Sequence, residues 1–193
     1  MSRSGVRILG GRWRGRRLQV PKGARPTESR VREALFGIWA PRLSGARVLD
    51  LFAGSGAVGL EALSRGAESA TLVDSSRAAL AALKQNREIL GASASRVMRC
   101  RLPAPRQTFG TPGYDLIFAD PPYAFEPMDA LIEGLAVGLA DGGELVVEHS
   151  ARRPLESFGR WTLHTTRRYG ESCLSFFELL EEEPLGIPAD RER

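Results

Sequence analysis

The chain has 193 residues, a length that suits one compact domain with a modest extension, and 42% of them are hydrophobic. No apolar run approaches the ~20 residues of a membrane span, and residues 1–7 lack the apolar centre of a signal peptide. Cys100 and Cys173 have neither metal-ligand nor redox spacing, which argues against a zinc site and a disulfide scaffold. We therefore expect a cytoplasmic monomer without a metal and without membrane contact.

The net charge is only +4 at pH 7, but the charge is unevenly distributed. Residues 1–32 are rich in arginine and contain a single acid, Glu28, whereas residues 181–183 are three glutamates. A basic arm of this kind indicates a phosphate-rich partner. The arginines could instead be ordinary solvated surface charges. The glycines and Trp13 that are interleaved with them favour nucleic acid.

Two elements are expected before the main sheet. Residues 6–20 contain two short apolar runs around glycine-rich turns, which predicts a small β-hairpin. Apolar residues from Val31 to Trp39 recur at helical spacing, and Pro41 should end this helix.

From residue 47 onward, apolar strands alternate with helical stretches, a pattern typical of a parallel sheet covered on both faces. Too few residues separate the last two strands for a helix, so they should form an antiparallel hairpin. The predicted fold is α/β, with a seven-stranded, doubly wound, mostly parallel sheet. The predicted strands are 47–52, 69–74, 95–100, 114–119, 143–149, 160–168 and 173–180, and the predicted helices are 57–65, 76–90 and 126–139. The predicted division is a basic hairpin arm at 1–26, a main domain at 27–180 and a tail at 181–193.

A glycine-rich turn follows the first strand of this sheet. Gly54, Gly56 and Gly59 fit the G-x-G-x-x-G pattern that NAD, FAD and S-adenosylmethionine proteins share. The glycines would let the backbone close on a nucleotide-type ligand. Alternatively, they could serve only a tight turn and close helix packing.

Two acids near this turn narrow the choice of cofactor. Asp74 ends the next strand, where a carboxylate can accept both hydroxyls of a ribose, although it could instead cap the helix that begins near Ser76. Asp50 suits a ligand with a cationic amino-acid end better than a pyrophosphate, so S-adenosylmethionine is favoured over NAD. The predicted cofactor-binding residues are Asp50, Phe52, Ala53, Gly54, Ser55, Gly56, Asp74 and Ser75.

The tetrapeptide Asp120-Pro121-Pro122-Tyr123 closes the strand 114–119. The prolines lack N–H groups, so the Asp120 carboxylate and the Pro121 carbonyl could accept the two N–H bonds of an exocyclic base amine. Accepting those bonds would aim the nitrogen lone pair at a methyl group, and Tyr123 could stack on the base. We expect Asp120, Pro121, Pro122 and Tyr123 to be catalytic. The alternative is a rigid turn in which Asp120 caps the helix near residue 126.

Residues 50–63 and 120–123 resemble those of class I S-adenosylmethionine-dependent amino-methyltransferases. Residues 7–18, 25–27, 30–36 and 60–66 resemble the bacterial family that methylates guanine N2 in 16S ribosomal RNA, and the resemblance extends over about residues 6–180. It implies S-adenosylmethionine as cofactor, guanine 966 as target and 16S rRNA, or the small ribosomal subunit particle, as partner. The residues expected to contact RNA are Arg7, Arg12, Trp13, Arg14, Arg16, Arg17, Arg25, Thr27 and Arg30.

Other functions remain open from the residues alone. The tetrapeptide by itself also fits adenine N6 or cytosine N4 methylation. The glycine pattern by itself also fits an NAD-linked oxidoreductase, which would have no use for the tetrapeptide. A non-catalytic RNA-binding assembly factor could retain the same fold. His149 could touch cofactor or base, but a structural role is favoured.

Overall fold

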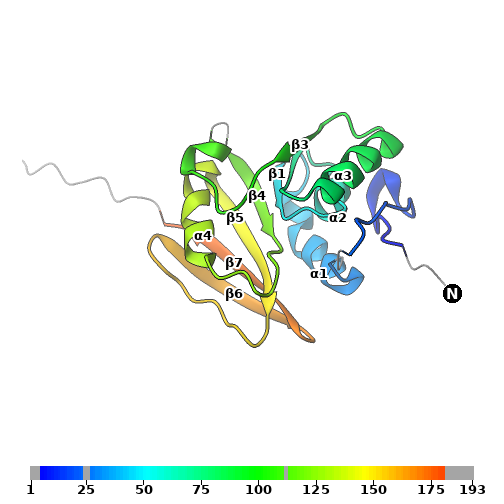
Figure 1. Ribbon diagram of the computed structural model, residues 1–193. Helices are drawn as coiled ribbons and strands as arrows, with labels where there is room; N and C mark the ends of the chain where they lie inside the picture. Colours follow the sequence, from blue (N-terminus) through cyan, green and yellow to red (C-terminus); the bar gives the residue numbers. More distant parts are fainter. Residues whose placement is uncertain (1–4, 24–26, 111–112, 181–193) are drawn as a thin grey trace, which may run out of the picture.

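The structure is a computed structural model that describes residues 5–23, 27–110 and 113–180. Seven strands form one sheet in the order β3-β2-β1-β4-β5-β7-β6 (Figure 1). Strands β1 to β5 are parallel to one another, whereas β7 runs antiparallel to both β5 and β6. The strands are β1 (Arg47–Leu51), β2 (Ser69–Asp74), β3 (Ser95–Arg99), β4 (Tyr114–Ala119), β5 (Leu139–Ser150), β6 (Trp161–Tyr169) and β7 (Ser172–Leu179).

This topology confirms the predicted fold class, including the antiparallel hairpin at the end of the sheet. Strand β1 lies between β2 and β4, so the chain order reverses on either side of it. In open α/β sheets, ligands bind outside the carboxyl ends of the strands at such a reversal. The carboxyl ends of β1, β2 and β4 are therefore where a site is expected.

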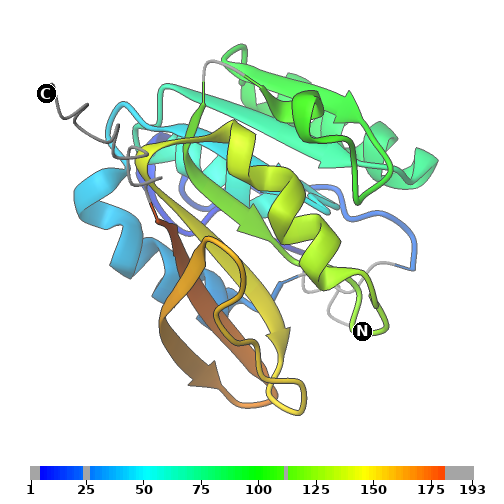
Figure 2. The same cartoon turned by 90° about the vertical axis from the view of Figure 1, so that its left-hand side faces the viewer.

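Helices cover both faces of the sheet. They are α1 (Ser29–Trp39), α2 (Ala57–Ser64), α3 (Arg77–Leu90) and α4 (Met128–Leu135). The first three pack with the N-terminal residues on one face, and α4 packs on the other, so α1 and α4 lie on opposite sides of the sheet (Figure 2). Among the described residues, no helix combines the length and apolar character that a membrane crossing requires.

The predicted ends of α3 are confirmed. Ser76 Oγ accepts a hydrogen bond from the N–H of Ala79, and Gly91 adopts the left-handed conformation that ends the helix. The helix predicted at 126–139 is shorter than expected. It begins at Met128, after Pro127, and a 3-10 turn at Ala136–Gly138 leads directly into β5.

The N-terminal segment, residues 5–20, is paired less regularly than a β-hairpin. A single antiparallel bridge joins Arg7 to Arg17, and a 3-10 turn at Gly11–Trp13 lies between them. Gly11 has a φ of 75°, and a Cβ there would lie 1.9 Å from the backbone oxygen of Ser64 on α2. The close approach to α2 therefore determines the shape of the segment, which sequence periodicity does not reveal.

The N-terminal segment shares the core of the main domain. Val6, Ile8 and Leu18 are buried in the same hydrophobic cluster as residues of α1, α2 and the sheet. The segment also lies beside α3, where the Arg16 guanidinium donates to the backbone oxygen of Ile89 (Figure 1). Its apolar side chains hold it to the domain, while its arginines remain exposed.

Glu61 on α2 holds this segment through a buried network. Its Oε2 accepts a hydrogen bond from the N–H of Leu9 at 3.0 Å and pairs with the Arg32 guanidinium at 3.2 Å. Its Oε1 accepts from Arg65, and the same Arg32 nitrogen also donates to the backbone oxygen of Arg7. Burial lowers the pKa of Arg32, and the charge of Glu61 opposes that effect.

Asn86 on α3 makes a second attachment. Its Oδ1 accepts from the N–H of Gln19, and its Nδ2 donates to the backbone oxygens of Gln19 and Ser55. One buried amide therefore joins the N-terminal segment to the glycine-rich turn. The position of the segment and the position of the turn are coupled.

Replacing Glu61 by Gln should destabilise the protein by about 3–5 kcal/mol, because the buried Arg32 charge loses its partner. Urea unfolding followed by tryptophan fluorescence measures this change. The matched control is Glu171→Gln, which breaks the exposed Arg152–Glu171 pair and should cost less than ~1 kcal/mol. Equal effects of the two substitutions would show that the buried network does not hold the fold.

Candidate active site

The carboxyl ends of the parallel strands border one open cavity of about 590 Å³. The glycine-rich turn after β1, the end of β2 and the tetrapeptide after β4 each contribute residues to it. It therefore brings together both motifs that the sequence singles out. Its lining includes Phe52, Gly54, Asp74, Ser75, Asp120, Pro121, Pro122, Tyr123 and Glu148, together with Pro21, Lys22, Gly23, Thr27 and Glu28.

The three glycines of the turn have different roles. A Cβ on Gly54 would meet nothing nearer than a backbone oxygen at 3.9 Å, so the missing side chain leaves open space on the cavity. A Cβ on Gly56 would lie 2.8 Å from Leu83, and one on Gly59 would lie 2.2 Å from Leu72. Gly54 therefore allows a ligand to approach, whereas Gly56 and Gly59 allow α2 to pack closely.

The backbone donors of this turn are largely used within the protein. The N–H of Ala53 donates to Val73, that of Gly54 to the Asp74 carboxylate at 3.0 Å, and that of Gly56 to Ala53. Phe52 has a φ of 57°, an uncommon conformation for a residue with a side chain. The conformation of the turn beside the cavity is thus fixed by hydrogen bonds within the protein. Ser55 is buried and packs into the protein interior.

Asp50 lies beneath this turn and is only 2% exposed. Its Oδ2 accepts the N–H of Gly59 at 2.9 Å. Burial raises the pKa of Asp50 to about 7, the Gly59 bond opposes this, and the charges of Asp120 and Asp74 add to the rise. It also lines a small cavity of about 40 Å³ next to the main one, with Ala53, Gly54 and Ser55 among its neighbours. A cation in these cavities would favour its charged form.

Asp74 has the helix-capping role considered for it, and its role toward a ribose stays a prediction. One carboxylate oxygen accepts the N–H of Gly54, and the other accepts the N–H of Ser76 at the start of α3. Each oxygen of an ionised carboxylate can accept a second hydrogen bond. Asp74 therefore stabilises the turn and the helix start, and it retains acceptor capacity on the cavity side.

Asp120 is oriented by a residue 93 positions earlier in the sequence. Thr27 Oγ1 donates to Asp120 Oδ2 at 2.8 Å. Thr27 was predicted to contact RNA, but it lies in the cavity wall against this carboxylate. Nothing in the local sequence pairs two residues so far apart.

Tyr123 lies at the mouth of the cavity. It is 44% exposed, and its hydroxyl lies 3.3 Å from Ser172 Oγ at the start of β7. Pro121 is buried and Pro122 is exposed beside it. Phe125 packs edge-on against Phe52, with ring centroids 5.3 Å apart, and so joins the tetrapeptide to the glycine-rich turn.

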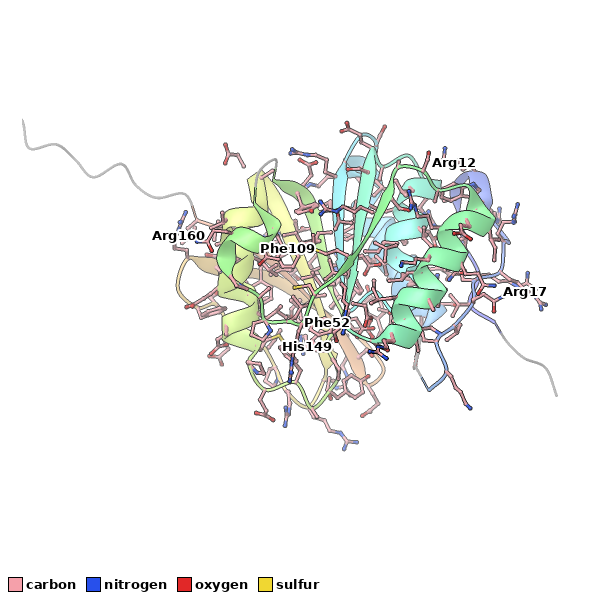
Figure 3. All side chains as sticks on the ribbon, turned by 45° about the horizontal axis from the view of Figure 1, so that its top comes forward. Arg12, Arg17, Phe52, Phe109, His149 and Arg160 are labelled. Atoms are coloured by element: carbon pink, nitrogen blue, oxygen red, sulfur yellow. The ribbon has the colours of Figure 1, made fainter. Side chains whose placement is uncertain are left out.

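His149 has a structural position, as its pattern suggested. Its Nε2 lies 2.8 Å from Ser175 Oγ, and its Nδ1 lies 2.9 Å from the backbone oxygen of Arg153. Burial lowers its pKa. Figure 3 shows Phe52, in the turn after β1, and His149, on β5, in the same region of the molecule. The neighbouring Glu148 lines the main cavity and was not predicted.

The described arginines among the predicted RNA-contacting residues are all exposed, and we call them together the arginine surface. Arg12 and Arg17 lie at one end of the molecule, and Arg160 lies at the other (Figure 3). Trp13 is only partly exposed because it packs against the core, and the Arg12 guanidinium lies 4.2 Å from its ring centroid. Arg25 lies outside the described residues. The exposed arginines of this set are Arg7, Arg12, Arg14, Arg16, Arg17 and Arg30.

The raised pKa of Asp50 predicts a pH-dependent stability. The folded chain keeps the Asp50 proton up to about pH 7, whereas the unfolded chain loses it near the ordinary value of 3.8. Because the folded state binds more protons in this window, its stability from Asp50 falls as pH rises from 3.8 to about 7. Asp50→Asn should flatten the dependence of Tm on pH across this range. Parallel Tm curves for the two proteins would contradict the assignment.

Comparisons with known proteins agree with this geometry. The family described as conserved hypothetical protein 95 matches residues 6–178. Ribosomal RNA small subunit methyltransferase D of Escherichia coli K12 is 39% identical over 178 residues, covering 90% of this chain and 89% of that protein. The protein of the same name from Haemophilus influenzae is 36% identical over 165 residues, covering 82% and 86%.

Solved structures show the same fold. A structure from Escherichia coli has a TM-score of 0.78 at 37% identity and covers 92% of this chain and 99% of its own. The structure of a hypothetical protein from Thermus thermophilus has a TM-score of 0.74 at 35% identity and covers 89% and 98%. The resemblance carried by residues 50–63 and 120–123 is confirmed. The chain therefore belongs to the family described as conserved hypothetical protein 95, and its relatives include the ribosomal RNA small subunit methyltransferase D proteins.

Proposed function

We propose that this protein transfers a methyl group from S-adenosylmethionine to the exocyclic N2 amine of a guanine in 16S rRNA. Family membership supports the reaction class and the RNA substrate. The observation that carries the proposal is the shared cavity, in which the Asp120-Pro121-Pro122-Tyr123 clamp faces the glycine-rich turn and Asp74. A methyl donor and an amine must meet in one place, and this cavity borders the residues suited to each.

The residues around the turn fit S-adenosylmethionine. Gly54 leaves open space on the cavity, so the backbone can approach a ligand closely. Asp74 would accept the ribose hydroxyls with its remaining acceptor capacity, and Ser75 lies next to it. Asp50 would face the cationic amino-acid end of the cofactor, directly or through water. When bound, the cofactor would supply an electrophilic methyl group.

The clamp would position and activate the amine. An exocyclic base amine is conjugated with its ring and is weakly nucleophilic. The Asp120 carboxylate and the Pro121 carbonyl would accept its two N–H bonds, which localises the lone pair on nitrogen and aims it into the cavity. As the nitrogen gains positive charge, the carboxylate stabilises it, and this stabilisation is greatest in the transition state.

Thr27 would fix the carboxylate of the clamp, and Tyr123 would fix the base. Thr27 donates to one oxygen of Asp120 and so restricts the rotation of that carboxylate. Tyr123 is exposed, lies next to Ser172, and would stack on the face of a base removed from its helix. The clamp would thus hold the base by its amine edge and by its face.

The arginine surface would hold the RNA backbone. Residues 21–23 line the cavity and directly follow the arginine-rich segment in the sequence, so RNA bound to these arginines would extend toward the clamp. Arginine contacts to phosphates orient RNA without reading its sequence. The substrate would be 16S rRNA or the small ribosomal subunit particle, bound by a cytoplasmic monomer.

Asp120→Ala should lower the methyl-transfer rate at least ~100-fold, because a positioned acceptor of the transition state is removed. Single-turnover transfer from radiolabelled cofactor measures the rate, and calorimetry should show little change in S-adenosylmethionine affinity. Near-normal turnover in this variant would contradict the clamp. Binding of NAD in preference to S-adenosylmethionine would contradict the cofactor.

Thr27 tests whether the orientation of Asp120 matters. Thr27→Val removes the hydroxyl donor and keeps the shape, so it should lower kcat roughly tenfold, the effect of one hydrogen bond to a charged group. Thr27→Ser keeps the donor and should restore the rate. Equal rates in the Val and Ser variants would show that Thr27 acts only through packing.

The exposed arginines are tested by salt dependence. Replacing Arg12, Arg14 and Arg17 by Gln should weaken RNA binding and reduce the slope of log affinity against log salt by roughly 0.7–0.9 for each phosphate that is no longer neutralised. These three are chosen because Arg7 and Arg16 also bond to the backbone. Arg160→Gln, at the opposite end of the molecule, is the control. An unchanged slope in the triple variant would show that Arg12, Arg14 and Arg17 do not contact RNA phosphates.

A further inference from the structure

Glu148 is a buried acid beside the clamp that the reaction described so far does not use. It lies near the end of β5 and is 4% exposed. In the parallel pairing of β4 with β5, Phe118 lies opposite Val146 and Ala119 opposite Val147. Continuing this register by one residue beyond the end of β4 would bring Glu148 opposite Asp120, on the same face of the sheet.

Glu148 also borders the space that the clamp encloses. It lines the main cavity together with Asp120, Tyr123 and Ser172. It also lines the adjacent cavity of about 140 Å³, with Pro121 and Pro122. A second carboxylate therefore borders the same space as Asp120 and Pro121. Together with the Asp120 carboxylate and the Pro121 carbonyl it adds an acceptor to this part of the cavity, which favours a ligand edge that presents several donors in a row.

The two buried glutamates of β5, Glu144 and Glu148, differ in their surroundings. Glu144, on the same strand, is also buried, but it accepts a hydrogen bond from the Trp39 indole at 2.9 Å and lies 3.6 Å from the Arg42 guanidinium. Glu144 therefore stabilises contacts of α1 and does not line the cavities that Glu148 lines. Burying a carboxylate is costly, and at Glu148 that cost falls beside the predicted base site.

Guanine, adenine and cytosine differ in the hydrogen-bonding group that each would present to these acceptors. Each base with an exocyclic amine has a ring nitrogen next to the amine-bearing carbon. In guanine this position, N1, carries a hydrogen and is a donor, so N1–H and the N2 amine form a continuous donor edge. In adenine the corresponding N1, and in cytosine the corresponding N3, are acceptors. A carboxylate beside the clamp attracts the first and repels the other two.

We propose that Glu148 accepts a hydrogen bond from N1–H of the target guanine and thereby selects guanine N2 over adenine N6 and cytosine N4. This inference rests on the proposed function and adds to it a specificity-determining residue. Asp120 and Pro121 hold the reacting amine, and Glu148 reads the ring atom next to it. A site built to bond a particular donor discriminates strongly against analogues that lack it, because its own polar group then remains buried and unmatched.

The test uses two RNA substrates that differ at this ring atom and at the exocyclic group on C6. One carries guanine at the methylated position, and the other carries 2,6-diaminopurine, which keeps the N2 amine but has an acceptor at N1. Transfer rates are measured for the natural protein, Glu148→Gln and the matched control Glu144→Gln. RNA affinity in the presence of S-adenosylhomocysteine provides a second readout, and calorimetry with S-adenosylmethionine verifies the cofactor site.

The natural protein should prefer guanine over 2,6-diaminopurine. Glu148→Gln should reduce transfer to guanine roughly tenfold, because a charged acceptor of N1–H is replaced by a neutral one. Its preference between the two RNAs should shrink in rate and affinity, because an amide can donate to the N1 acceptor of 2,6-diaminopurine. Glu144→Gln should leave the preference unchanged, and cofactor affinity should be equal in all three proteins.

Two results would overturn the inference. If Glu148→Gln lowers transfer to both RNAs by the same factor, or lowers neither, Glu148 does not read the ring nitrogen, although guanine methylation by the natural protein would still support the proposed function. If the natural protein binds S-adenosylmethionine but methylates neither RNA, the proposed function fails and the role of Glu148 fails with it.

Discussion

The buried pair of Glu61 and Arg32 determines where the N-terminal segment lies, and the candidate site depends on that segment. Glu61 belongs to α2, the helix that follows the glycine-rich turn, and it also binds the backbone of Leu9. The chain that continues from this segment forms a wall of the cavity, and Thr27 within it orients Asp120. The N-terminal segment is thus bonded to α2 through Glu61 and to the glycine-rich turn through Asn86, so the arm is an integral part of the domain.

The site gathers acceptors at the carboxyl ends of neighbouring strands. Asp50, Asp74 and Glu148 belong to β1, β2 and β5, and Asp120 directly follows β4. The raised pKa of Asp50 reflects burial together with repulsion from Asp120 and Asp74. Such a concentration of negative charge is unfavourable without a ligand. It suits a cationic cofactor and a base edge that presents donors, so the arrangement that costs stability is the one that binding would use.

The sequence predicts the sheet well because its signals are local. Strands 69–74 and 114–119 begin and end where their apolar runs do, and Ser76 and Gly91 bound α3 as capping chemistry predicts. Both motifs of the site could be found because each follows a strand. The irregular N-terminal turn and the contact between Thr27 and Asp120 could not be predicted, since they depend on approaches between residues far apart in the chain. Glu148 gave no clear signal, since it is one of two acids in the predicted strand 143–149, and the cavity that it shares with Asp120 is seen only in the structure.

We propose that this protein forms N2-methylguanosine in 16S rRNA. Mass spectrometry of nucleosides from 16S rRNA tests it most directly, in cells with the natural gene, without the gene, and with the gene carrying Asp120→Ala. N2-methylguanosine should fall in cells without the gene and in cells carrying Asp120→Ala, and it should return when the natural gene is restored. An unchanged level of N2-methylguanosine, or the loss of a methylated adenosine or cytidine instead, would contradict it.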